Sequence, residues 1–229
     1  MIRGWPLALL LLAAPSYAAP KPEDITAHRL LAAQDARVAR IGYRLAEANA
    51  RFCSPKPGFN PGWVVNDINL YPEPETAKAA FGFIRPVAIS AIVAGGPADM
   101  AGLKTGDGIV AINGRDMATL TPDSSPATAR LEAFRKLLSD SWFAKNPAKL
   151  TIDRKGTVLD LSFQPGPVCP SYFWVETRDR VDAGADGEGV RLTTGLLRFI
   201  SNDDELAYVA AHELAHNLLG HRARLNGLK

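Results

Sequence analysis

The chain has 229 residues, of which 47% are hydrophobic and 22% are charged, and its formal net charge is +2. This composition gives enough apolar surface for one or two folded domains and excludes a disordered polyelectrolyte. The small positive excess also excludes a general nucleic-acid-binding protein, which would concentrate Lys and Arg on one surface.

The first 18 residues have the pattern of a secretory signal peptide. Arg3 precedes a short apolar run over residues 7–14, and Ser16-Tyr17-Ala18 fits a small-x-small cleavage site. The run is shorter than the roughly 20 apolar residues of a membrane span; an uncleaved anchor is the alternative interpretation. We therefore expect residues 1–18 to be removed, which leaves a periplasmic or secreted protein without a membrane span.

Cys53 and Cys169 are the two cysteines of the chain. An exported protein enters an oxidising compartment, where a pair of cysteines commonly forms a disulfide. Sequence does not give the distance between their Cα atoms, so two separate buried thiols are the alternative. The Cys-x-x-Cys spacing that would indicate a zinc site is not present.

The segment after the cleavage site, residues 19–53, is predicted to form a long helix. Apolar residues recur at steps of three and four from Ile25 to Leu45, and Glu23 and Asp24 suit the positive end of a helix dipole. Residues 54–79 contain five prolines, which predicts a connector with one short strand at Trp63-Val64-Val65.

Residues 80–165 alternate short apolar runs with turn residues. Gly95-Gly96-Pro97, Thr105-Gly106-Asp107 and Asn113-Gly114 mark the turns, and the spacing from Leu131 to Leu138 predicts an amphipathic helix. This stretch resembles a bacterial PDZ domain. The resemblance implies a small β-barrel with two helices, and it makes peptide C-termini the expected partners.

Four residues, Ala80, Phe81, Gly82 and Phe83, stand where PDZ domains keep their carboxylate-binding loop. Successive backbone N–H groups in such a loop capture a terminal carboxylate, and the neighbouring strand pairs with the incoming peptide. The alternative is that Phe81 and Phe83 are aromatic residues of the hydrophobic core.

Residues 166–229 are predicted to hold two strands, at residues 172–175 and 189–192, on either side of a turn. The turn contains several Asp residues, but Thr193 stands where a calcium loop needs a bidentate Glu, so we interpret it as a plain hairpin turn. A helix follows, with Asn202 and Glu205 at capping-box spacing. Its apolar stripe consists of Leu206, Ala210, Leu214 and Leu218.

This last helix carries the pentad His212-Glu213-Leu214-Ala215-His216. Four residues make just over one helical turn, so the imidazoles of His212 and His216 can converge on one metal ion. Glu213 projects beside that ion, where its carboxylate can take a proton from a zinc-bound water whose pKa is lowered to about 7. The pattern indicates a zinc hydrolase with Glu213 as general base; a helix with two solvent-facing histidines is the alternative.

A catalytic zinc ion needs three protein ligands and one open position. His221 is the nearest further histidine, but on a continuous helix its side chain would point away from that of His212. We therefore do not expect His221 to be the third ligand.

The pentad also stands within a wider pattern. Thr194-Gly195-Leu196-Leu197, residues 202–207 and the pentad together resemble the HtpX-like and CAAX-prenyl-protease-like gluzincin zinc metallopeptidases. The resemblance implies zinc as cofactor, peptide or protein substrates, and a third ligand that is a Glu on a later helix. The chain stops soon after the pentad, so we expect this Glu in a C-terminal part beyond Lys229.

These observations predict an α+β protein with a long N-terminal helix, a PDZ-like barrel and the N-terminal part of a gluzincin domain. The function they favour is that of an exported zinc metalloendopeptidase whose PDZ domain binds peptide termini. The alternative is a non-catalytic peptide-binding protein whose peptidase segment is a remnant without its third ligand.

Overall fold

The computed structural model describes residues 19–53, 58–122 and 125–226, and it combines helices with parallel and antiparallel strands. The predicted α+β class is confirmed. The predicted signal peptide, residues 1–18, lies outside the described residues. Within the described ranges, no helix is both long and apolar enough to cross a membrane.

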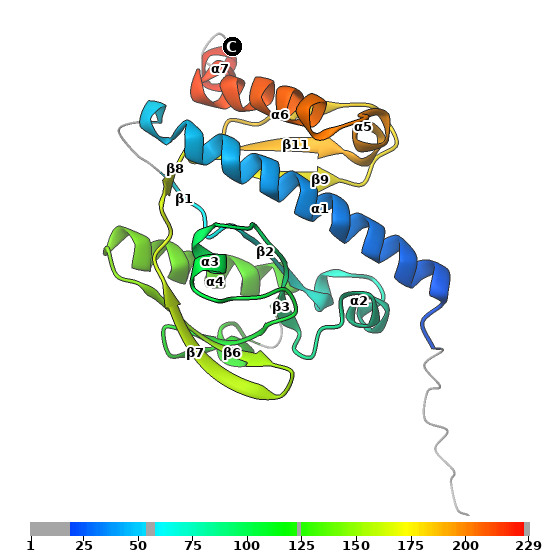
Figure 1. The fold of residues 1–229 in the computed structure, drawn as a ribbon, viewed down its shortest axis with the longest axis vertical. Coiled ribbons are helices and arrows are strands. Elements are labelled where there is room, and N and C mark those ends of the chain that lie inside the picture. The colour runs from blue at the N-terminus through cyan, green and yellow to red at the C-terminus, as the bar shows by residue number, and fades with distance from the viewer. Residues whose placement is uncertain (1–18, 54–57, 123–124, 227–229) are drawn as a thin grey trace, which may run out of the picture.

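The long N-terminal helix, α1 (Pro22–Ala48), runs between two β-sheets (Figure 1). Pro22 occupies the first turn, where its missing N–H leaves no hydrogen bond unmade, and the acidic Glu23 and Asp24 follow it. A short 3-10 helix, η1 (Ala50–Phe52), comes directly after α1. The predicted N-terminal helix is thus confirmed.

The larger sheet contains antiparallel strands and lies in the middle of the chain. Its strand order is β2-β3-β4-β6-β7, and β5 pairs with β4. Among the described strands no pairing joins β2 to β7, so the sheet that forms the predicted PDZ-like barrel is open between these two strands. The strands are β2 (Trp63–Asp67), β3 (Val87–Ile92), β4 (Gly108–Ile112), β5 (Arg115–Asp116), β6 (Ala148–Arg154) and β7 (Thr157–Phe163).

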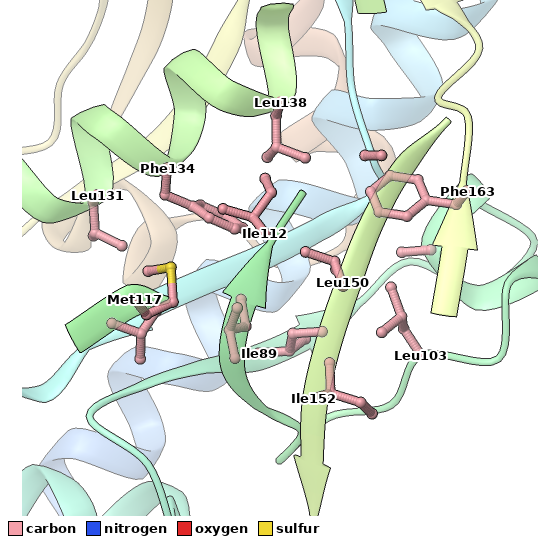
Figure 2. Close-up of a cluster of buried hydrophobic side chains, with 14 residues drawn as sticks. Ile89, Leu103, Ile112, Met117, Leu131, Phe134, Leu138, Leu150, Ile152 and Phe163 are labelled. Carbon is pink, nitrogen blue, oxygen red and sulfur yellow. The ribbon is translucent and has the colours of Figure 1, made fainter. Parts of the chain in front are cut away.

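Helix α4 (Ala127–Phe143) packs on this sheet and supplies Leu131, Phe134 and Leu138 to its core. Figure 2 shows these three side chains in the same cluster as Ile112 and Leu150 of the strands. The predicted amphipathic helix is therefore present. A second, shorter helix, α3 (Pro97–Met100), follows β3.

The Pro-rich stretch predicted as a connector contributes both strands and helices to the fold. β2 is an edge strand of the larger sheet, so this sheet begins at Trp63 and not at residue 80. A 3-10 helix, η2 (Ile68–Leu70), and a helix, α2 (Pro74–Phe81), follow β2. Pro74 occupies the first turn of α2, where proline is tolerated, so the prolines mark the boundaries of elements.

The smaller sheet has the order β10-β11-β9. Strands β9 (Tyr172–Glu176) and β11 (Gly189–Thr193) correspond to the two predicted strands, but they are parallel, and β10 (Ala183–Ala185) pairs antiparallel with β11. The hairpin turn therefore joins β10 to β11, and the interpretation of β9 and β11 as its two arms was wrong. Three helices follow: α5 (Thr194–Phe199), α6 (Asp203–Leu218) and α7 (His221–Asn226).

Cys53 follows η1, and Cys169 follows a short strand, β8 (Pro167–Val168), that pairs with β1 (Gly58–Phe59). The Cα atoms of the two cysteines are 5.2 Å apart, which is within the range of disulfides. The N–H of Cys169 also donates to the carbonyl oxygen of Ala46 at 2.9 Å. The two cysteines thus lie at disulfide distance, as the disulfide prediction requires.

Asp35 lies on the part of α1 that faces the region of α2. Burial raises the pKa of its carboxyl from 3.8 to about 6. The hydroxyl of Tyr71 is also affected, because burial and the charge of Asp35 together raise its pKa to about 12. The ring of Tyr71 packs against His28 of α1 and Phe81 of α2, with centroid distances of 5.4 and 5.3 Å.

The substitution Asp35→Asn is expected to raise the free energy of unfolding by on the order of 2 kcal/mol at pH 7.5. The folded state binds the Asp35 proton more tightly than the unfolded state, so the stability of the native protein falls as the pH rises from about 4 to about 6. The increase in the free energy of unfolding that Asp35→Asn causes should therefore vanish near pH 4. Urea unfolding at both pH values measures it, with Glu132→Gln on the exposed face of α4 as control. Equal stability of Asp35→Asn and wild type at pH 7.5 would contradict the expectation.

Candidate active site

The helix that carries the pentad, α6, is fixed at its start by a capping box. The Asn202 side chain accepts the N–H of Glu205 at 2.9 Å, and the Glu205 carboxylate accepts the N–H of Ser201 at 2.8 Å. Asp203 forms salt bridges with Arg37 and Arg40 of α1. The predicted caps are confirmed, and they attach the start of α6 to α1.

The buried face of α6 holds it against the smaller sheet. Leu206, Ala210 and Leu214 are buried, together with Val190 and Leu192 of β11. Leu218, the last residue of the predicted stripe, is 38% exposed, so the buried stripe ends one turn earlier than predicted. His212 and His216 lie on another face of α6, where His212 is exposed and His216 half-buried.

The two pentad imidazoles have the separation that a shared zinc ion requires. Their Nε2 atoms are 3.2 Å apart, and their ring centroids are 4.9 Å apart. Two nitrogens that each lie 2.0–2.1 Å from a zinc ion at a tetrahedral angle would be about 3.3 Å apart. His212 and His216 therefore fit zinc as a pair of ligands.

His221 does not join this pair as a third ligand. Its Nδ1 lies 2.7 Å from Nδ1 of His216, which is a different ring nitrogen from the Nε2 that faces His212. Gly220, with φ +63°, separates α6 from α7, so the helix is not continuous and His221 turns toward His216. Within the described parts of the chain, no group of three or more His, Cys, Asp or Glu is arranged to hold a metal ion.

Glu213 lines a pocket of about 250 Å³ beside the imidazoles. His216 and His221 line the same pocket, and so does Ala185 of the edge strand β10. The remaining lining residues are Asn217, Arg222 and Leu225. The pocket thus brings a carboxylate, imidazoles and a strand edge together.

Asn217 anchors α6 to the turn between β10 and β11. Its Nδ2 donates to the carbonyl oxygen of Gly189 at 2.8 Å and to Oγ of Ser171 at 3.2 Å, and its Oδ1 accepts the N–H of Gly187 at 2.8 Å. Asp186 closes the same turn by accepting the N–H groups of residues 188 and 189. Sequence reasoning missed Asn217, because its partners lie 28 to 46 residues away along the chain.

The four residues predicted as a carboxylate-binding loop lie at the end of α2. Ala80 and Phe81 are its last residues, and Gly82, with φ +68°, caps it. The N–H groups of Gly82 and Phe83 both donate to the carbonyl oxygen of Lys78, at 2.9 and 3.2 Å. These two N–H groups are therefore already used, and Phe83 is buried in an apolar cluster, as in the core alternative.

The edge of the larger sheet at β2 offers a different place for a peptide. In the described part of the sheet, β2 pairs with β3 on one side only. Its first residue, Trp63, stacks on Phe134 of α4 with 6.0 Å between ring centroids, so the edge strand lies beside a helix. An edge strand next to a helix is the arrangement in which an extended peptide can add as a further strand.

The comparisons with known proteins match two separate parts of the chain. The PDZ domain model matches residues 35–127, and the Peptidase family M48 model matches residues 157–227. The chain combines a PDZ domain with an M48 peptidase segment. No curated protein matches the chain.

The M48 match covers the smaller sheet and the pentad helix, and the PDZ match covers β2, β3 and β4. The PDZ match also begins well before residue 80, in agreement with the place of β2 in the larger sheet. Together the two matches support a protease with a peptide-binding domain.

Proposed function

We propose that this protein is an exported zinc-dependent metalloendopeptidase. His212 and His216 are its zinc ligands, Glu213 is its general base, and proteins or peptides are its substrates. The M48 match and the 3.2 Å separation of the two Nε2 atoms support the proposal. The proposal rests mainly on the separation of these two atoms.

Zinc, when bound, supplies Lewis-acid chemistry that activates water for attack on a peptide carbonyl. Glu213 lies one residue from His212, about 100° around the helix, so its carboxylate stands beside the site and is not a ligand. From there it accepts a proton from the attacking water and passes it to the leaving amine.

The substrate lies along β10 in this proposal. β10 is an edge strand, and Ala185 places it at the wall of the pocket that Glu213 lines. An extended peptide can pair with such an edge through backbone hydrogen bonds, which hold the scissile bond near the carboxylate. The three hydrogen bonds of Asn217 fix the distance between β10 and the pentad helix.

The PDZ domain binds peptide termini in this proposal, at the open edge of β2 beside α4. Export places the protein in the periplasm or outside the cell, where Cys53 and Cys169 form a disulfide. The sequence of residues 1–18 and the 5.2 Å separation of the two Cα atoms support this part.

Metal binding and proteolysis by the full-length protein, with the third ligand that the family resemblance implies, test the proposal. Calorimetric titration should show one zinc ion per chain, and the binding should be lost in His212→Ala and His216→Ala but retained in His28→Ala. Hydrolysis of an unfolded protein substrate should stop when a chelator is added and return when zinc is restored. Proteolysis that survives complete removal of metal would overturn the proposal.

A second candidate is a non-catalytic peptide-binding protein. It is favoured by one observation, namely that no third metal ligand joins the two imidazoles within the described residues. Binding of a fluorescent peptide with a free C-terminus, without zinc binding or hydrolysis, would support this candidate.

A further inference from the structure

Three imidazoles form a continuous chain at the end of the pentad helix. His212 and His216 face each other through Nε2 at 3.2 Å, and His216 and His221 face each other through Nδ1 at 2.7 Å. The rings of His216 and His221 meet edge to face, with centroids 4.7 Å apart at 75°. Both nitrogens of His216 are therefore engaged, each by a different histidine.

Two neutral imidazoles that approach through Nδ1 at 2.7 Å need one proton between these atoms, because each ring nitrogen either donates or accepts. If His216 carries that proton, its Nε2 keeps a free lone pair and can bind a metal ion. If His221 carries it, the proton of His216 moves to Nε2, which then cannot be a ligand. The direction of this one hydrogen bond decides whether His216 can bind metal.

We propose that His221 is a positioning residue that accepts a hydrogen bond from Nδ1–H of His216 and so keeps Nε2 of His216 free for zinc. The inference rests on the proposed function in taking His216 as a zinc ligand. The metal-distal nitrogen of a ligating histidine almost always donates to an acceptor, which fixes both the tautomer and the ring orientation. His221 supplies that acceptor here.

The break between α6 and α7 is what brings His221 into this position. Gly220 adopts φ +63°, a left-handed conformation that glycine reaches without a steric cost, and α7 begins at the next residue. The N–H of Arg224 then donates to the carbonyl oxygen of Gly220 at 3.1 Å, which continues the new helix. The change of direction returns the His221 ring to His216.

The tautomer of His216 can be measured without metal. The full chain has four histidines, so long-range ¹H–¹⁵N correlation spectra of the metal-free protein at pH 8 can be assigned by single substitutions. Wild-type His216 is expected to be protonated at Nδ1 and unprotonated at Nε2. His221→Phe keeps an aromatic ring but removes the acceptor, so His216 should change to the Nε2–H form. His221→Asn restores a carbonyl acceptor and should restore the wild-type form.

Zinc affinity provides the second readout. His221→Phe should raise the zinc dissociation constant by about 10–100-fold, the usual effect of losing such a partner, and His221→Asn should recover most of this loss. Tyr208→Phe is the control, because Tyr208 lies on the exposed face of the same helix, α6, and does not line the pocket. Amide spectra of β9, β10, β11 and α6 check that this part of each variant is folded, and His221→Ala is a second variant without the acceptor.

The outcomes separate this inference from the proposed function. A wild-type His216 that carries its proton on Nε2, or acceptor-free variants with unchanged tautomer and zinc affinity, would overturn the role of His221. The predicted tautomers in a protein that binds no zinc would support the hydrogen bond and refute the zinc peptidase. Zinc binding that is equal in wild type and both acceptor-free variants would support the zinc peptidase and refute the role of His221.

Discussion

Replacement of Glu213 by Gln is expected to lower the rate of peptide hydrolysis by roughly 10²–10⁴-fold, the usual contribution of a general base. Gln has nearly the same shape as Glu but cannot accept a proton from the attacking water. Because His212 and His216 are untouched, the zinc dissociation constant should stay at its wild-type value. Initial rates on an unfolded protein substrate, with the zinc content of each sample, measure both effects.

Glu188→Gln is the matched control for this experiment. Glu188 is an exposed carboxylate on the turn between β10 and β11, and it does not line the pocket that Glu213 lines. Its substitution removes the same charge and should leave hydrolysis unchanged. Undiminished activity in Glu213→Gln would refute the proposed mechanism, and loss of zinc from that variant would show that Glu213 is a ligand.

The features of the site that could be predicted are those set by short spacings along one helix. The step from His212 to His216 is one turn, and the structure places their Nε2 atoms 3.2 Å apart. The caps at Asn202 and Glu205 can also be predicted from the sequence, because a capping box joins residues three apart. Local hydrogen-bond chemistry therefore specifies this helix almost completely.

The position of His221 could not be predicted in the same way. It depends on whether the helix continues through Gly220, and a glycine near a helix end only indicates that a break is favoured. The structure ends α6 at Leu218 and starts α7 at His221. A change of one backbone dihedral thus converts a side chain expected to point away into a neighbour of His216.

The pairing between strands that are distant in the sequence could not be predicted either. β9 and β11 were assigned correctly as strands, but their parallel pairing depends on the path of the chain through β10. In the same way, β2 was seen as an isolated strand, and its place at the edge of the larger sheet follows from pairing with β3, beyond α2. Hydrophobic pattern identifies a strand, but it does not identify the partner of that strand.

Reduction of the pair Cys53 and Cys169 is expected to lower the melting temperature by roughly 10 °C or more. The bond would close a loop with a sequence separation of 116 residues. In the chain-entropy account, a loop of this size restricts the unfolded chain enough to contribute about 4–5 kcal/mol. Thermal unfolding with and without a thiol reductant measures the effect, and Cys53→Ser/Cys169→Ser should melt at the reduced temperature and ignore the reductant.

The positions of the two cysteines predict which contacts in the protein loosen when the disulfide is reduced. Both flank the larger sheet, which runs from Trp63 to Phe163, and the N–H of Cys169 is hydrogen-bonded to Ala46 near the end of α1. The bond would fix both ends of this sheet at one point, so its movements relative to the M48 segment would be hinge-like. Because the core of the sheet contains neither cysteine, amide spectra of its strands should be unchanged after reduction, while contacts between α1 and the M48 segment loosen. Mass spectrometry of folded protein purified from the periplasm provides the decisive measurement, since two free thiols in that sample would refute the bond.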